Sequence, residues 1–281
     1  GLMKYFYVIS NLSKDYVLDV QDEVQSCLEK RGAVCRYMTD YERMKNGRHT
    51  PGEYVPEDTQ CIITIGGDGT LIQAARDLAG RNIPMLGINR GHLGFLNQVD
   101  RTEDIDAAMD ALVNERFRLE RRMMLRGTVF HEGKPVFQDI ALNEIIATSA
   151  EHLRVLRYDL AVNDEYLNEY AADGVMVATP TGSTAYNLSA GGPVMAPAGR
   201  MMAVTPVCSH TLNARSIVIS EEDRVKIGLL GKGLVTFDGD TSQKTGPGDY
   251  LIVERSHMET VMVKLKQISF MQNLSNYLGN V

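Results

Sequence analysis

A short apolar run that ends at three glycines wrapped around one aspartate constrains this chain most. The run Ile62-Ile63-Thr64-Ile65 is rich in β-branched residues and predicts a buried strand. Gly66-Gly67-Asp68-Gly69-Thr70 follows, and residues 71–78 predict a helix. Glycines allow a positive φ and leave backbone N–H groups open to an anion, while a helix N-terminus adds partial positive charge. The segment therefore predicts a phosphate cradle that uses Gly66, Gly67 and Gly69.

The carboxylate of Asp68 indicates which kind of reaction this cradle serves. A carboxylate beside a phosphate is repelled unless it contacts a metal ion or accepts a proton from a nucleophile. That favours phosphoryl transfer to a hydroxyl group, with Asp68 as the general base. The alternative is a tight turn with a helix cap, and for an isolated Gly-Gly-Asp-Gly that alternative is the better one.

The composition limits the classes of protein that remain. A chain of 281 residues with 44% hydrophobic residues suggests two domains, or one large one, with a sizeable core. A net charge of −7 argues against nucleic-acid binding, although local amides and arginines can still bind an anion. The sequence has no Cys-x-x-Cys pair, no signal peptide and no membrane-length apolar run. We therefore predict reduced thiols and a cytoplasmic protein that does not bind membranes.

The N-terminal part alternates between predicted strands and helices. Strands are expected at 5–9, 33–38, 61–65 and 84–88, and helices at 15–30, 71–78 and 103–114. This alternation predicts a Rossmann-like α/β domain with a parallel sheet and right-handed crossovers. Ligands bind such sheets at the carboxyl ends of strands, so residues 66–69 and 89–95 are expected to form two walls of one cleft. The polar stretch 39–58 predicts a mobile surface loop.

The texture of the sequence changes after residue 115. Short β-rich runs dominate from 116 to about 266 and predict a mainly-β domain. Residues 270–278 predict a short helix. We therefore divide the chain into an α/β domain over 1–115, a β-rich domain over 116–266 and a tail over 267–281 that returns to the first domain.

A hydroxyl-rich stretch from Asp173 to Pro193 is the second informative segment. A predicted strand ends at Thr179-Pro180, and Thr181, Ser183 and Thr184 follow before the aromatic ring of Tyr186. Ser183 or Thr184 can cap a short helix there. Such a site can hold a polyol or a nucleotide, with Tyr186 stacked on a base. A hydroxyl-rich turn with a core tyrosine explains the same residues about as well.

Polar pairs within apolar surroundings give two further candidates. Asn143-Glu144 interrupts the apolar run 140–147, where polar groups are unfavourable unless paired. The pair can hold the two hydroxyls of a ribose, or else point to solvent at a sheet edge. Asp238-Gly239 is a hairpin signal, which we favour over a role in ligand binding. His92 and His210 lack metal-ligand partners at a suitable spacing, so we predict hydrogen-bonded structural histidines, although His92 can also assist with phosphate.

Taken in order, these motifs resemble those of the NAD kinases. That family transfers a phosphoryl group to the 2′-hydroxyl of the adenosine ribose of NAD and so makes NADP. The matching segments occur in the family's order and span most of the chain: 66–70, 89–95, 143–144 and 173–193. The first motif is also shared with lipid kinases of the diacylglycerol and sphingosine type. The Thr-Pro-Thr-Gly-Ser-Thr-Ala-Tyr stretch is far more specific.

The resemblance implies a role for each matching residue. Asp68 resembles the base, Asn143 and Glu144 the ribose-binding pair, and Asp173 the carboxylate near the nicotinamide. Tyr186 and its neighbours resemble the adenine pocket, which an aromatic residue lines, and one arginine occupies the position of a contact from a neighbouring subunit. The residues implied to contact NAD are Asp68, Gly69, Phe95, Asn143, Glu144, Arg154, Asp173, Thr181, Thr184, Ala185, Tyr186 and Ser189.

The resemblance also implies a fold, a set of substrates and an assembly. The fold is an α/β N-terminal domain followed by a mainly-β NAD-binding domain, similar to NAD kinases and diacylglycerol kinases. The implied substrates are NAD and ATP (or polyphosphate), with a divalent metal such as Mg²⁺ whose ligands the sequence does not identify. Self-association to a dimer or tetramer is also implied. Ala171 stands where some members carry arginine, which leaves the choice between NAD and NADH open.

Two other functions remain as alternatives. A lipid kinase would share the glycine motif but should lack the site at 179–186, and would show a basic or apolar membrane face. A non-catalytic NAD(P)-binding sensor would keep the pocket but lose the acid–base residue, whereas Asp68 is present.

Overall fold

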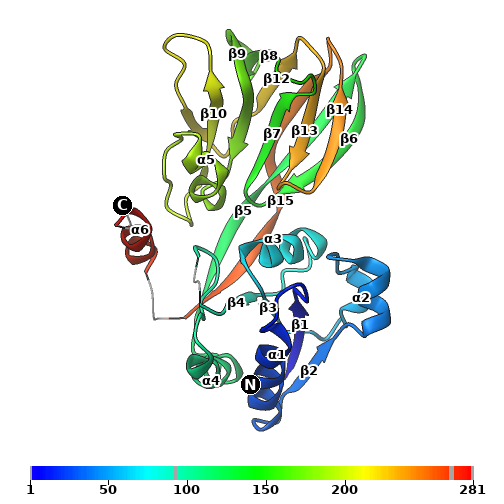
Figure 1. Ribbon diagram of the computed structural model, residues 1–281, viewed down its shortest axis with the longest axis vertical. Helices are drawn as coiled ribbons and strands as arrows, with labels where there is room; N and C mark the ends of the chain where they lie inside the picture. The colour runs from blue at the N-terminus through cyan, green and yellow to red at the C-terminus, as the bar shows by residue number, and fades with distance from the viewer. Residues whose placement is uncertain (1, 92–93, 266–268, 280–281) are drawn as a thin grey trace. The chain divides into compact units, whose positions relative to one another are not determined.

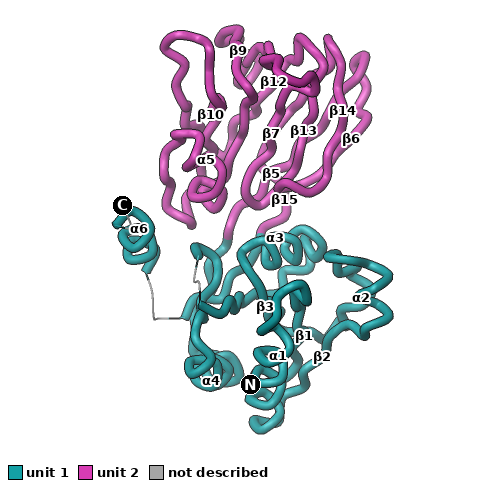
Figure 2. The backbone as a smooth tube through the Cα atoms, viewed as in Figure 1, with its two compact units in different colours: residues 1–121, 260–281 teal, residues 122–259 magenta. Residues whose placement is uncertain are grey.

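The computed structural model describes residues 2–91, 94–265 and 269–279 of the chain (Figure 1). It divides into two compact units, which are Gly1–Arg121 with Thr260–Val281, and Arg122–Glu259 (Figure 2). The divisions fall inside two long strands, β5 (Arg118–His131) and β15 (Tyr250–Lys264). Among the described residues, no helix is both long and apolar enough to span a membrane.

The first unit is built on a parallel sheet in the order β4-β3-β1-β2. Its strands are β1 (Tyr5–Ser10), β2 (Val34–Tyr37), β3 (Cys61–Ile65) and β4 (Met85–Ile88). Its helices are α1 (Val17–Glu29), α2 (Asp40–Asn46), α3 (Asp68–Asp77), α4 (Ile105–Val113) and α6 (Phe270–Leu278), with 3-10 turns at Gly52–Tyr54 and Thr102–Asp104. The predicted α/β domain is confirmed.

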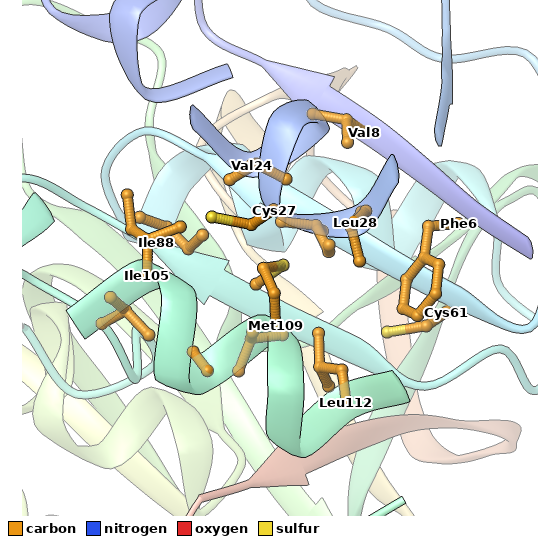
Figure 3. Packing of buried hydrophobic residues seen from close by; sticks show 14 of the residues in the cluster. Phe6, Val8, Val24, Cys27, Leu28, Cys61, Ile88, Ile105, Met109 and Leu112 are labelled. Atoms are coloured by element: carbon orange, nitrogen blue, oxygen red, sulfur yellow. The ribbon is translucent and has the colours of Figure 1, made fainter. Parts of the chain in front are cut away.

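Helices α1 and α4 bury their apolar faces against this sheet. Figure 3 shows Leu28 of α1 and Met109 and Leu112 of α4 packed near Phe6 of β1 and Ile88 of β4. All of these side chains are at most 2% exposed. Burying an apolar side chain of this size contributes roughly 1.5–3 kcal/mol. The packed side chains between the helices and the sheet therefore stabilise the positions of β3 and β4.

The segment 39–58 contains more regular structure than the sequence suggested. Thr39 and Glu42 form a capping box at the start of α2, a Thr-x-x-Glu signature that is visible in the sequence. Further on, the guanidinium of Arg81 donates to the carbonyls of Gly52 and Val55. These contacts tie the segment to the body of the unit.

The second unit is mainly β, as predicted, and its strands pair antiparallel. Along one path the order is β14-β13-β7-β9-β8-β12-β15, and β10 pairs with the other edge of β9. The remaining elements are β6 (Lys134–Ala141), β7 (Glu144–Ser149), β8 (Leu156–Val162), β9 (Glu165–Ala178), β10 (Met201–Ser209), β11 (Ile217–Ser220), β12 (Val225–Leu229), β13 (Gly233–Phe237), β14 (Thr241–Thr245), a 3-10 turn at Thr181–Thr184 and α5 (Tyr186–Ser189). The buried Tyr158, Val177 and Phe237 belong to its core.

Candidate functional site

The glycine turn joins the end of β3 to the start of α3. The N–H of Gly66 donates to the carbonyl of Ile88 at 2.9 Å, so the turn is tied to the neighbouring strand β4. A Cβ at Gly66 would lie 2.4 Å from Oγ1 of Thr70, which explains why only glycine fits. By contrast, a Cβ at Gly67 or Gly69 would have no heavy atom within 4 Å. The backbone at these two glycines therefore faces open space in which an anion can approach.

Asp68 is the first residue of α3, and its carboxylate is held by the loop that follows β4. Nδ2 of Asn97 donates to one carboxylate oxygen at 2.7 Å, and the N–H of Phe95 donates to the other at 3.3 Å. Gly94 has a φ of +63°, and a Cβ there would lie 2.8 Å from the carboxylate. The loops at 66–69 and 89–95, which the sequence placed at the same edge of the sheet, thus meet at Asp68.

Asn97 is a residue of this site that sequence reasoning missed. Its side chain is only 1% exposed and occupies the space left by Gly87, where a Cβ would lie 2.2 Å from Oδ1 of Asn97. That Oδ1 has no hydrogen-bond partner among the described residues, which costs about 1–3 kcal/mol in a buried site. In return for this unpaired oxygen, the amide N–H₂ of Asn97 points at Asp68. The available signal was a polar residue between Leu96 and Val99, both of which are buried.

Phe95 lies against aromatic side chains of the C-terminal helix. Its ring centroid is 6.2 Å from that of Phe270 and 5.8 Å from that of Tyr277, both on α6. Helix α6 spans the residues expected for the tail helix. His92, the histidine considered for phosphate, lies outside the described residues.

In the second unit, Asn143 and Glu144 are joined to the hydroxyl-rich stretch by backbone contacts. The carbonyl of Asn143 accepts the N–H of Thr179 at 2.9 Å. Oγ1 of Thr179 in turn accepts the N–H of Gly182 at 3.0 Å. A Cβ at Gly182 would lie 2.0 Å from the carbonyl oxygen of Asn143, so the approach requires glycine. Two motifs far apart in sequence therefore form one network.

The carboxyl group of Glu144 is buried at the start of β7, with 7% of the residue exposed. Burial, followed by the negative charge of Asp238, raises the pKa of Glu144 to about 7, although hydrogen bonds from the backbone of Glu144 and Tyr186 oppose the shift. A carboxyl group in this state can accept hydrogen bonds from hydroxyl groups near neutral pH and exchange a proton there. It does not point freely to solvent, the alternative considered from the sequence.

The hydroxyls between Thr181 and Ser189 have different tasks. Ser183 is fully buried and bonds the carbonyl of Pro180 at 2.7 Å and the N–H of Met195 at 2.9 Å, so it fixes the turn. Neither it nor Thr184 caps a helix through its side chain, because Pro180 and Ala185 occupy the two N-cap positions.

A buried arginine and an exposed tyrosine flank these hydroxyls. Thr181 accepts a hydrogen bond from Nη1 of the buried Arg122 at 3.1 Å. The Tyr186 side chain is 47% exposed and is therefore not a core tyrosine. Its neighbours Thr184 and Ala185 are half-buried, and Ser189 is exposed, so this side of the turn is open to a ligand.

The side chains of Asp173 and Arg154 are exposed, and each lies near another polar side chain. Asp173 precedes Gly174, which pairs with Thr148, whereas Glu144 pairs with Ala178 near the other end of the paired segment. Oδ1 of Asp173 lies 3.7 Å from Nε2 of His210. The guanidinium of Arg154 lies 3.3 Å from Glu151.

The donor set around Asp68 bears on how a metal ion would bind. Within the described residues, no three His, Cys, Asp or Glu side chains are grouped so that they could hold an ion. Mg²⁺ commonly keeps several waters and binds through one or two carboxylates together with substrate phosphates. The site fits an ion of that kind.

The four cysteines are free thiols, as the sequence predicted.

Comparison with known proteins gives matches along nearly the whole chain. A family model described as the ATP-NAD kinase N-terminal domain matches residues 12–117, and one described as the ATP-NAD kinase C-terminal domain matches residues 142–265. An NAD kinase from Lachnospira eligens is 37% identical over 292 residues, covering 98% of this chain and 99% of that protein. An NAD kinase from Agathobacter rectalis is 37% identical over 285 residues, covering 99% of each.

Solved structures share the fold at lower identity. Yeast NADH kinase complexed with NADH gives a TM-score of 0.86 at 21% identity, covering 100% of this chain and 88% of that one. An NAD kinase from Archaeoglobus fulgidus in complex with ATP gives a TM-score of 0.75 at 22% identity, covering 98% and 97%. The resemblance expected from the motifs is thereby confirmed: this chain is a phosphotransferase that belongs to the NAD kinase family.

Proposed function

We propose that the chain phosphorylates the 2′-hydroxyl of the adenosine ribose of NAD, using ATP or another phosphoryl donor. The observation that carries the proposal is the Asp68 carboxylate, fixed at the first turn of α3 beside the open backbone of Gly67 and Gly69. The solved relatives support both substrates, because one was complexed with NADH and another with ATP.

Asp68 orients the acceptor hydroxyl and takes its proton as the hydroxyl oxygen attacks the γ-phosphorus of ATP. The bond from that phosphorus to the β–γ bridging oxygen breaks, and ADP leaves. Asn97 and the Phe95 N–H fix both carboxylate oxygens, so the base is held in place before substrate binds. The N–H of Gly66 already donates to Ile88. We therefore assign phosphate binding chiefly to the N–H groups of Gly67 and Gly69, and give Gly66 the task of shaping the turn. These amides offset charge on the transferring phosphoryl group.

The network in the second unit binds the acceptor nucleotide. Asn143 and Glu144 hold the ribose hydroxyls, and Tyr186 stacks on the adenine. Glu144 accepts hydrogen bonds best as a carboxylate, so binding should strengthen as the pH rises through about 7. Further contacts to NAD are assigned to Gly69, Phe95, Asp173, Thr181, Thr184, Ala185 and Ser189.

A divalent metal, Mg²⁺, completes the proposed chemistry. We propose that the donor phosphates would hold most of its coordination sphere and that Asp68 would be the carboxylate of this chain that helps to hold it. When bound, Mg²⁺ neutralises charge on the phosphoryl group during transfer. A dimer or tetramer with Arg154 reaching a neighbouring subunit, and a cytoplasmic location, are parts of the same proposal.

The direct test is an assay for NADP. Purified protein is mixed with NAD, ATP and Mg²⁺, and NADP is followed with a dehydrogenase specific for it. Parallel reactions replace NAD by NADH, ATP by inorganic polyphosphate, and Mg²⁺ by EDTA. We expect NADP with ATP and NAD, and none with EDTA. Binding of NAD without any phosphorylation by any donor would overturn the proposal in favour of a sensor.

A further inference from the structure

The turn between β13 and β14 has a carboxylate at its first corner. Asp238 and Gly239 have φ values of +51° and +67°, and the N–H of Asp240 donates to the carbonyl of Phe237 at 3.0 Å. The hairpin that the Asp-Gly pair predicted is therefore present: residues 238–240 join β13 to β14, and Asp238 and Gly239 are the two left-handed corners of the turn. The hairpin explains the glycine, but aspartate is only one of several residues that suit the first corner.

The side chain of Asp238 grips the segment that enters β7. One carboxylate oxygen accepts the N–H of Leu142 at 2.6 Å, and the other accepts those of Asn143 at 2.8 Å and Glu144 at 3.1 Å. The N–H of Asp238 donates back to the carbonyl of Glu144 at 3.0 Å. Three successive amides around one anion form a nest, and charged acceptors make stronger hydrogen bonds than neutral ones.

The other side of the same segment is also held. The hydroxyl of Thr179 donates to the carbonyl of Leu142, and the carbonyl of Asn143 accepts the N–H of Thr179 at 2.9 Å. Asp238 thus holds the N–H groups of Asn143 and Glu144, and Thr179 holds the carbonyl of Asn143. The backbone that carries these two side chains cannot rotate without breaking these hydrogen bonds.

We propose that Asp238 is a positioning residue for the acceptor site, which sets the direction of the Asn143 and Glu144 side chains toward the ribose without touching the substrate. The inference rests on the proposed function of this pair. It assigns the Asp238 carboxylate a task beyond the turn in which it lies.

The charge of Asp238 has a second effect on the same pair. It adds to burial in raising the pKa of Glu144, while the backbone of Glu144 and Tyr186 opposes the rise. Replacing Asp238 by asparagine keeps a residue that tolerates left-handed backbone but removes the charge. The variant should therefore loosen the segment and lower the pKa of Glu144 together.

The test compares Asp238→Asn with Asp164→Asn in the full chain. Asp164 also lies in a two-residue turn, between β8 and β9, with a φ of +67°. For Asp238→Asn we expect KM for NAD to rise about tenfold at pH 8, with kcat within about threefold of the wild type. The rise of KM on acidification, which we expect near pH 7 in the wild type, should move to lower pH. Asp164→Asn should change neither quantity.

A second readout does not depend on activity. Hydrogen-exchange mass spectrometry of the peptide that contains residues 142–144 should show faster exchange in Asp238→Asn than in Asp164→Asn. An unchanged KM with faster exchange would show that Asp238 is only structural and would overturn the inference. Unchanged exchange would overturn the nest itself. Failure of the wild type to make NADP would instead refute the proposed function, and it would leave the exchange result to test the nest.

Discussion

Asp68-Gly69 and Asp238-Gly239 are the same dipeptide in the two units of the chain, with different surroundings. The Asp68 carboxylate is held by the Asn97 amide and one backbone N–H, at the first turn of a ten-residue helix. The Asp238 carboxylate is held by three successive backbone N–H groups, in a hairpin turn. The helix N-terminus and the open glycine backbone make the surroundings of Asp68 suitable for chemistry on an anion. The Asp238 carboxylate instead stabilises a backbone conformation.

The comparison indicates that the surroundings of an aspartate, and not the dipeptide, decide what it does. The Asp68 carboxylate lies beside glycine backbone that faces open space, whereas the Asp238 carboxylate accepts three successive backbone N–H groups. The third Asp-Gly pair, Asp173-Gly174, lies within β9 and has His210 as its neighbour at 3.7 Å. The dipeptide alone therefore predicts neither turn nor catalysis.

The largest effect is expected from Asp68→Asn. Asparagine keeps the size of the side chain and an oxygen that can accept from Asn97, but it cannot take a proton. General-base catalysis contributes typically ~10²–10⁴-fold, so kcat should fall within that range while the circular dichroism spectrum stays unchanged. Steady-state NADP formation measures the loss. Activity near that of the wild type would rule out Asp68 as the base.

Gly94→Ala should lower kcat by about 10²-fold, because a misplacement of about 1 Å can have that effect. The new Cβ would lie 2.8 Å from the Asp68 carboxylate. Gly91→Ala is the matched control, since Gly91 has a φ of +80° on the same loop but no heavy atom within 4 Å of a Cβ. Both variants carry backbone strain, so equal losses of kcat would argue against crowding of Asp68.

Asn97→Ala should reduce kcat about tenfold or more, since hydrogen bonds to charged groups contribute about 1.5–3 kcal/mol. It removes the donor 2.7 Å from Asp68 and leaves the backbone of the loop in place. Asn114→Ala, which removes a donor to Asp110 in α4, is the control. If kcat for Asn97→Ala matches that of the control, the Asn97 amide is not needed to orient the base.

Glu144→Gln should stabilise the fold above neutral pH although it weakens the site. Because the folded-state pKa of about 7 lies above the usual 4.5, the stabilising contribution of the protonated group is present below pH 4.5 and is lost as the pH rises through 7. We expect the variant to exceed the wild type by roughly 1–3 kcal/mol at pH 8, and much less at pH 5. Urea unfolding at both pH values measures the gap, with Glu165→Gln at the exposed start of β9 as control. A gap that does not depend on pH would contradict the assignment.

The smallest effect is expected from Tyr186→Ala. Stacking of a base on an aromatic ring contributes ~1–3 kcal/mol, so KM for NAD should rise about tenfold with little change in kcat. Tyr166→Ala, at a tyrosine that is 66% exposed in a hairpin, should leave KM unchanged. An unchanged KM in Tyr186→Ala would argue against stacking.

Local patterns in the sequence were sufficient to predict most of the fold. The strand that ends at Ile65, the glycine turn and the helix α1 can each be predicted within about a dozen residues. The signals are the spacing of apolar residues and the glycines that interrupt it. The helix α2 was missed because its faces are polar, and none of its residues is buried. A capping box was its only local signal.

The partners of the candidate residues could not be predicted in the same way. Asn97 meets Asp68, and Asp238 meets Asn143, only after the strands that carry them are paired. Arg122 reaches the hydroxyl of Thr181 for the same reason. Sequence motifs were sufficient to choose the residues that we propose to act on a ligand, whereas the residues that hold them depend on tertiary contacts.

The most direct test measures kcat, KM for NAD and the free energy of unfolding in parallel for Asp68→Asn and Asp238→Asn. The account predicts opposite patterns. Asp68→Asn should lose kcat by ~10²–10⁴-fold with its unfolding free energy preserved. Asp238→Asn should keep kcat within about threefold while KM rises about tenfold. If the two variants lost kcat equally, or if Asp68→Asn kept its kcat, the division between a chemical and a positioning aspartate would be wrong.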